Sequence, residues 1–168
     1  MMGVSAQKTS INVAIATWEW PAYFDPKLKA EGIRLNISKW RRPAPNTIPW
    51  DAKAAGLYMI CTLSKHEAEQ QGYSESLMLD FEGNVAEGTS ANIFFKDKNN
   101  ELHTPTPDSF LNGITRQAVI ELAKSKNIKV HERKISPDEL GNFHGCFLTG
   151  TAAEITPVAS IADHKYKI

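Results

Sequence analysis

The chain has 168 residues, of which 42% are hydrophobic and 23% charged, values that are typical of one globular domain with a buried core. Its 19 Lys and Arg residues balance 19 Asp and Glu residues, so no net field attracts nucleic acid or an anionic membrane. The longest apolar run, residues 57–63, is too short to cross a bilayer. We therefore expect no nucleic-acid partner and no membrane partner.

The N-terminal segment MMGVSAQKTS lacks the apolar core of a signal peptide, which predicts a cytoplasmic location. Cys61 and Cys146 are isolated and have no CxxC spacing. This pattern predicts reduced core thiols, and neither a disulfide nor a metal site. The five histidines show no metal-ligand spacing, so no metal is expected.

The first forty residues are predicted to form two strands on either side of a short helix. Apolar residues alternate with other residues over 11–15, which is the period of a half-buried strand. Asp25 and Pro26 are suited to the start of a helix, and Gly32 is suited to its end. A second alternating segment, residues 33–37, predicts another strand.

A segment with three prolines, residues 40–50, leads into the longest predicted helix, residues 51–71, with Gly72 as its C-terminal cap. Lys53 falls in the first turn of this helix. The helix dipole disfavours a cation there and so favours the neutral amine that can attack a carbonyl. The apolar spacing predicts that one face of the helix is buried, formed by Ala52, Ala55, Met59, Leu63 and His66.

The second half of the chain alternates short strands with turns and a further helix. Strands are predicted over 77–79, 93–95, 101–103, 128–130, 146–148 and 158–161. Residues 136–139 have the composition of a capping box. The helix that begins after Gly113 is expected to bury Ala118, Val119, Leu122 and Ala123. With no repeat or linker, the sequence predicts a single α+β domain.

Four segments carry a specific resemblance: WRRPAPNTIPWDAKAAGLY (40–58), EGTSANIFF (87–95), LNGITR (111–116) and GTAAEITPV (150–158). In this order they resemble the class IV pyridoxal-phosphate aminotransferases, and the branched-chain amino acid group above all. The resemblance runs from VAIATWEW near the start to the last of these segments. It implies the C-terminal large domain of the D-amino acid aminotransferase-like fold (fold type IV), a pseudo-barrel sheet with flanking helices. Residues 1–20 would then be the last strand of a small domain and the connection. Residues 21–168 would be the large pyridoxal-phosphate-binding domain, truncated at its C-terminal end.

The resemblance implies roles for three residues. Lys53 would be the Schiff-base lysine, and its amine would then move a proton as general base and acid. Glu87 would keep the pyridine nitrogen protonated, and the hydroxyl of Tyr58 would bond to the phenolic oxygen. Without the resemblance, these residues read as a solvated lysine, a turn glutamate and a core tyrosine. Ala91 stands where some relatives carry a second glutamate, so an extended carboxylate network is not expected there.

The start of the second helix is a candidate phosphate site, because the first amides of a helix have no internal partners and carry positive partial charge. Ile114 and Thr115 are therefore the predicted phosphate ligands, joined by Thr151. On its own, the Gly-Ile-Thr sequence is a weak signal, since many helices begin this way.

The substrate is expected to lie beside the segment GTAA, where small residues let a ligand approach the backbone. The amides of Thr151 and Ala152 could hold a substrate carboxylate. By resemblance, Trp20 and Tyr23 line the pocket for an apolar side chain, although aromatic residues at such spacing are more often core. Arg42 is expected to brace the active-site loop.

The resemblance implies transamination of branched-chain L-amino acids (leucine, isoleucine and valine) with 2-oxoglutarate through pyridoxal 5'-phosphate. The partners would be the amino acid and 2-oxo acid substrates and further copies of the chain, as a dimer or higher homo-oligomer. Alternatives are a D-amino acid aminotransferase, an aminodeoxychorismate lyase, or a non-catalytic cofactor-binding or assembly domain. The 168-residue chain is expected to be a fragment with little activity alone.

Overall fold

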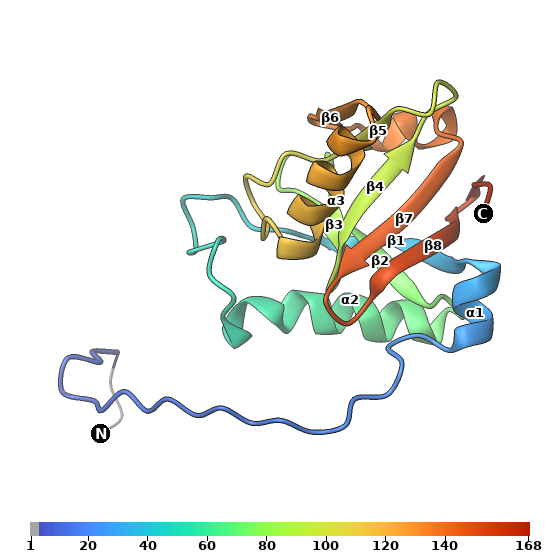
Figure 1. Ribbon diagram of the computed structural model, residues 1–168. Helices are drawn as coiled ribbons and strands as arrows, with labels where there is room; N and C mark the ends of the chain where they lie inside the picture. Colours follow the sequence, from blue (N-terminus) through green and yellow to red (C-terminus); the bar gives the residue numbers. More distant parts are fainter. Residues whose placement is uncertain (1–3) are drawn as a thin grey trace.

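The computed structural model describes residues 4–168 and shows an α+β fold built on one curled nine-stranded sheet (Figure 1). The strands are β1 (Ile33–Arg41), β2 (Glu75–Leu79), β3 (Val85–Gly88), β4 (Asn92–Lys96), β5 (Leu102–Thr104), β6 (Val130–Glu132), β7 (Gly145–Gly150), β8 (Glu154–Ile161) and β9 (His164–Lys165). The helices are α1 (Pro26–Glu31), α2 (Met59–Gln70) and α3 (Ile114–Ser125), with 3-10 helices η1 (Ala55–Tyr58) and η2 (Pro137–Asn142). The predicted fold class is confirmed.

The strand order explains why the sheet must curl. The order is β3-β2-β1-β8-β7-β4-β5-β6, with β9 beside β8, so four strands stand between β3 and β4. In a flat sheet these two strands would lie about 24 Å apart. Yet β3 ends at Gly88 and β4 begins at Asn92, a length of chain that reaches at most about 14 Å. The turn 89–91 therefore closes the sheet into a half barrel.

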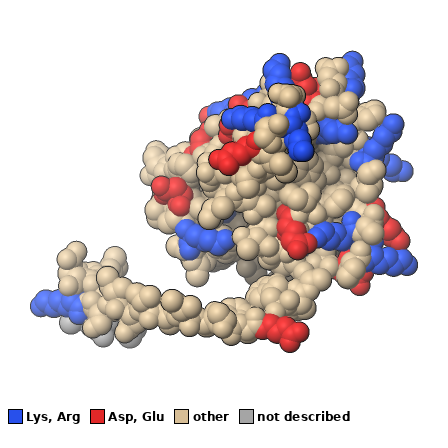
Figure 2. Space-filling model, viewed as in Figure 1, with Lys and Arg blue, Asp and Glu red and all other residues tan. Residues whose placement is uncertain are grey.

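Helices cover different parts of the curled sheet. Helix α2 packs against β1 and β2, whereas α3 packs against β6 and β7 (Figure 1). The main core lies inside the curl and includes Leu35, Leu77, Ile93 and Leu148, each with an exposed fraction of 0%. A second cluster lies beneath α3, where the rings of Phe94 and Phe147 stack at 5.1 Å. Lys, Arg, Asp and Glu are interspersed on the face that Figure 2 shows.

Several local predictions are confirmed by their capping geometry. The side chain of Asp25 caps α1 by accepting bonds from the amides of Lys27 and Leu28, and Gly32 ends the helix with a φ of 80°. The capping box of Ser136 and Glu139 is present at the start of η2. The donor and acceptor of each capping bond lie within three residues of each other, so these bonds form with little dependence on the rest of the fold.

The predicted strand over residues 11–15 is wrong, because this part of the chain is extended but pairs with no strand in residues 4–168. Ile11, Val13 and Ile15 have exposed fractions of 92%, 88% and 93%. In Figure 1 the segment runs away from the body of the domain. Alternation gives a strand only where a neighbouring strand supplies hydrogen bonds and a surface to cover.

The long helix begins later than predicted, at Met59 instead of Asp51. Ala54 is extended, with φ −103° and ψ 136°, and Gly56 lies in the short 3-10 turn η1. Because glycine is unfavourable inside a helix, Gly56 weakens the helix in this region. The segment 51–54 before it is a loop with turns. Lys53 therefore lies outside any helix, and its predicted place in a first helical turn is wrong.

The buried faces of the two long helices also differ from the prediction. Helix α2 buries Cys61, Ser64 and Ala68, while Met59 and Leu63 have exposed fractions of 67% and 45%. Small side chains let α2 approach β1 closely, where the hydroxyls of Ser64 and Ser38 lie 2.7 Å apart. Helix α3 buries Arg116, Ile120 and Ala123, whereas the predicted Ala118 and Leu122 face outward.

The strand β3, which carries Glu87, was not predicted, because its sequence VAEG contains one β-branched residue only. Both cysteines are free and buried, as predicted. Across residues 4–168, no helix combines the length and the apolar character that a membrane span requires.

Candidate active site

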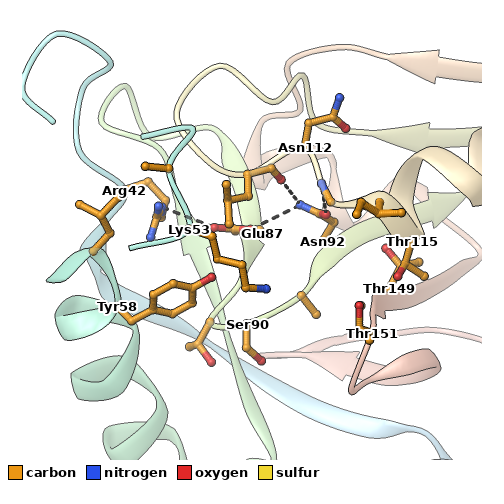
Figure 3. A pocket seen from close by; sticks show the side chains of 18 residues that line it. Arg42, Lys53, Tyr58, Glu87, Ser90, Asn92, Asn112, Thr115, Thr149 and Thr151 are labelled. Carbon is orange, nitrogen blue, oxygen red and sulfur yellow. Dashed lines mark hydrogen bonds and ion pairs between the residues drawn. The ribbon is translucent and has the colours of Figure 1, made fainter. Parts of the chain in front are cut away.

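A cavity of about 220 Å³ opens between the loop before η1, the β3–β4 turn, the start of α3 and the end of β7 (Figure 3). These segments are far apart in the sequence and meet because the sheet curls. The cavity is lined by all six residues predicted to bind or react with a cofactor: Lys53, Tyr58, Glu87, Ile114, Thr115 and Thr151.

Lys53 and Tyr58 enter this cavity from the same stretch of chain. Lys53 lies on the loop and Tyr58 is the last residue of η1, and both side chains point toward the cavity (Figure 3). On a continuous helix the two residues would not share a face, but the loop removes that constraint. Burial raises the pKa of Tyr58, and the charge of Glu87 raises it further. The phenol therefore keeps its proton and can donate a hydrogen bond.

Glu87 lies on β3 with an exposed fraction of 8%. One carboxylate oxygen is 3.5 Å from Nε of Arg42, and the other accepts a hydrogen bond of 3.4 Å from the side-chain amide of Asn92. Burial raises the pKa of Glu87 to about 8, although the Arg42 guanidinium opposes the shift. Glu75 raises it further, and Lys53 lowers it. A cation placed beside this carboxyl would favour its ionised form.

Asn92 links that carboxyl to the start of α3. Its side-chain N–H group donates to the carbonyl of Leu111 at 2.9 Å, and its side-chain oxygen accepts from the amide of Gly113 at 3.1 Å. A Cβ atom at Gly113 would lie 2.4 Å from that oxygen, so only glycine fits without displacement. No spacing in the sequence singles out Asn92, because its role depends on two segments that meet only in the fold.

The start of α3 lies at the other end of the cavity. The first intrahelical bond runs from Gln117 to the carbonyl of Gly113, which leaves the amides of Ile114 and Thr115 without partners in the helix. The hydroxyl of Thr149 is buried in the same region and has no hydrogen-bond partner in the described part of the chain. Figure 3 shows Thr115, Thr149 and Thr151 close together. Helix amides and an unsatisfied hydroxyl fit an anion such as a phosphate.

Arg116 holds this end of the cavity in place, although the sequence did not predict a role for it. It has an exposed fraction of 1% and donates to the hydroxyl of Thr104 at 3.2 Å. It also donates to Asn112 at 2.8 Å, to the carbonyl of Pro105 at 3.1 Å and to Glu132 at 2.8 Å. These bonds fix the loop that precedes α3 against β5 and β6.

The residues predicted to bind substrate line a second cavity of about 240 Å³. Trp20, Tyr23 and Ala152 belong to this cavity and not to the first, whereas Thr151 lines both. The hydroxyls of Tyr23 and Ser90 lie 2.8 Å apart, and Ser90 lines the first cavity. The two cavities are therefore neighbours: Thr151 lines both, and the contact between Tyr23 and Ser90 lies between them.

The family model for amino-transferase class IV matches residues 2–161. The chain belongs to this family. A probable branched-chain-amino-acid aminotransferase of Rickettsia bellii (strain RML369-C) is 44% identical over 154 residues, which are 92% of this chain and 52% of the relative. The branched-chain-amino-acid aminotransferase of Escherichia coli (strain K12) is 44% identical over 153 residues, which are 90% and 49% of the two chains.

A solved structure agrees with this assignment. The crystal structure of an aminotransferase from Brucella abortus bound to the cofactor pyridoxal phosphate has a TM-score of 0.79 and 33% identity. The match covers 89% of this chain and 52% of that structure. The chain thus spans about half the length of the aminotransferases that it matches.

Proposed function

We propose that this chain forms the pyridoxal-phosphate-binding part of an enzyme that transaminates branched-chain L-amino acids with 2-oxoglutarate. The observation that carries the proposal is the arrangement of the first cavity. An amine, a phenol and a buried carboxyl converge at one end, and the open start of a helix lies at the other. The names of the relatives support the substrate class.

The residues present fit pyridoxal phosphate group by group. The amides of Ile114 and Thr115, together with the hydroxyls of Thr149 and Thr151, would hold the phosphate. At the other end, Glu87 would face the ring nitrogen and Tyr58 the phenolic oxygen. The unsatisfied hydroxyl of Thr149 is the most specific support, because a buried polar group normally has a partner.

When bound, the cofactor supplies an electron-withdrawing ring that stabilises negative charge on the α-carbon of the amino acid. The chain supplies the groups around it. Glu87 in its ionised form would favour a proton on the ring nitrogen, and Arg42 and Asn92 hold Glu87 in place. Lys53 would be the amine that holds the cofactor through its aldehyde group, and as a free amine it would move the proton at the α-carbon, first as base and then as acid.

The second cavity is the proposed position of the substrate side chain and carboxylate. The backbone amides of Thr151 and Ala152 would hold the carboxylate, and Trp20 and Tyr23 would contact an apolar side chain. A homo-oligomer, a cytoplasmic location, and the division into residues 1–20 and 21–168 stay predictions.

A non-catalytic cofactor-binding domain would also need a phosphate site, but it would need neither Lys53 nor Glu87. An absorbance titration separates the two functions. Addition of pyridoxal phosphate to the 168-residue chain should give a saturable spectral change, and leucine should then change the spectrum again. Lys53→Ala is the control: leucine can still condense with a free aldehyde of the cofactor, but the 2-oxo acid of leucine should not form, because the amine that moves the α-proton is absent. A spectrum that saturates with cofactor but does not respond to leucine would favour the binding domain, and no saturable change would contradict the proposal.

A further inference from the structure

Glu75 is a buried acidic residue that the proposed chemistry does not use. It begins β2 and has an exposed fraction of 0%. One carboxylate oxygen accepts bonds from the hydroxyl of Thr89 at 2.6 Å, the amide of Thr89 at 3.3 Å and the amide of Ser76 at 2.8 Å. The other oxygen has no hydrogen-bond partner within the described residues, and the ammonium of Lys65 lies 4.0 Å away. A carboxylate this deep in the protein is costly unless it is hydrogen-bonded or paired, and the bonds from Thr89 and Ser76 offset that cost.

The segment that Glu75 holds is the turn 89–91, which closes the half barrel. This turn crosses between two strands that are separated by four others in the sheet order. Besides the bonds from Thr89 to Glu75, it contains a bond of 2.8 Å from the amide of Gly88 to the carbonyl of Ala91. β3 and β4 do not pair with each other, so no ladder of strand hydrogen bonds fixes their separation here.

Glu87, two residues before this turn, and Asn92, directly after it, line the first cavity, as do the turn residues 89–91 themselves. Glu87 is the penultimate residue of β3, and Asn92 is the first residue of β4. The side-chain N–H group of Asn92 donates a hydrogen bond to the carboxyl of Glu87 at 3.4 Å. The side-chain oxygen of Asn92 accepts a hydrogen bond from the amide of Gly113 at 3.1 Å. A movement of the turn would therefore displace both the carboxyl and the start of α3.

We propose that Glu75 is a positioning residue: through Thr89 it fixes the β3–β4 turn, and this turn fixes the positions from which Glu87 and Asn92 would contact the cofactor. This inference rests on the proposed function for the identity of the ligand. Its geometric part concerns the chain alone. The negative charge of Glu75 does not help the site, because it opposes ionisation of Glu87. What Glu75 contributes is an oxygen that accepts hydrogen bonds from Thr89.

The test uses pairs of variants that separate the acceptor from the charge and from the volume. Glu75→Gln keeps an acceptor oxygen for Thr89, whereas Glu75→Leu keeps most of the volume and removes the acceptor. Thr89→Ser keeps the hydroxyl donor, whereas Thr89→Val removes it. Glu69→Gln is the matched control, because Glu69 also lies near Lys65, at 3.5 Å, but is on the surface of α2 and far from the turn in the chain.

Two readouts are needed, of which the first requires no cofactor. Native-state hydrogen exchange at the amides of Thr89 and Gly113 should accelerate at least tenfold in Glu75→Leu and Thr89→Val, relative to the amide of Leu148 in β7. The dissociation constant for pyridoxal phosphate should rise at least tenfold in the same two variants. Glu75→Gln, Thr89→Ser and Glu69→Gln should stay within about threefold of the parent chain. A role in stability alone would change exchange at all three amides together.

The results that overturn the inference are distinct from those that overturn the proposed function. Equal behaviour of Thr89→Val and Thr89→Ser, or unchanged exchange at Gly113 in both disruptive variants, would contradict a positioning role for Glu75. If Glu75→Leu does not fold, hydrogen exchange at Gly113 in Thr89→Val decides, because Thr89 also lines the first cavity and its removal could change cofactor affinity directly. A parent chain that binds no pyridoxal phosphate contradicts the proposed function, and exchange at Gly113 then decides the geometric claim alone.

Discussion

The side-chain oxygen of Asn92 accepts a hydrogen bond of 3.1 Å from the amide of Gly113, and this contact joins the two ends of the candidate site. Through Asn92, the carboxyl of Glu87 on β3 is linked to the first turn of α3. The spacing between the proposed ring-nitrogen contact and the proposed phosphate contact is therefore set by two side chains and one glycine.

Gly113→Ala should destabilise the chain and weaken cofactor binding. The new Cβ atom would lie 2.4 Å from the Asn92 side-chain oxygen, so Asn92 or the helix start must move. Overpacking of this kind typically costs about 1–3 kcal/mol, which urea denaturation can measure. Gly56→Ala is the control, since nothing lies within 4 Å of its Cβ position. Equal effects of the two substitutions would contradict the role of Gly113.

Thr149→Val should stabilise the chain without cofactor and weaken its affinity for pyridoxal phosphate. The Thr149 hydroxyl is buried and has no hydrogen-bond partner in residues 4–168, so its removal relieves an unsatisfied group. Such a group costs about 1–3 kcal/mol. Thr156→Val is the matched control on the neighbouring strand, because its hydroxyl donates to the carbonyl of Ala153 at 2.6 Å. That control should destabilise the chain instead.

Urea denaturation measures the predicted gain in stability of Thr149→Val, and a cofactor titration on the same samples measures the predicted loss of affinity. If Thr149→Val lost stability and kept its affinity, the hydroxyl would not be a ligand of the phosphate.

Glu87 should make the stability of the cofactor-free chain depend on pH. Burial raises the folded-state pKa of Glu87 from 4.5 to about 8. The stabilisation from this group is therefore fully present below about pH 4.5, declines as pH rises, and is lost above about pH 8. Glu87→Gln cannot titrate, so the free energy of unfolding of the parent chain should fall relative to that of the variant across this window.

The comparison needs the difference between the two chains at each pH, because other groups titrate in both. An equal pH dependence for the parent chain and for Glu87→Gln would show that Glu87 is already ionised when the cofactor is absent. Saturating pyridoxal phosphate should reduce the difference, because a protonated ring nitrogen beside Glu87 favours the carboxylate.

Much of the candidate site could be predicted from the sequence, because its residues lie in the four segments that carry the family resemblance. The segments around Lys53, Glu87, Thr115 and Thr151 all reach one cavity. The local capping signals at Asp25 and Ser136 are also sufficient by themselves. The capping signals are complete within a few residues, whereas the site residues were predicted from the resemblance of the four segments in their order.

The parts that could not be predicted depend on contacts between distant segments. The buried face of α2 is chosen by the close approach to β1, which favours Ser64 over the larger Leu63. Asn92 and Thr149 have no distinguishing neighbours in sequence, and their roles arise where β4, β7 and α3 meet. The apolar alternation over 11–15 has no partner strand in the described chain, and the same pattern therefore yields an exposed segment.

Lys53 is the residue that we propose reacts with the cofactor in the first cavity. The direct test is borohydride reduction of the chain in the presence of pyridoxal phosphate, followed by proteolysis and mass spectrometry of the labelled peptides. The proposal predicts one stoichiometric label on Lys53, and its loss in Lys53→Ala without transfer to another lysine. A stoichiometric label on Lys65 or Lys124, or labels spread over surface lysines to the same extent in both chains, would contradict it.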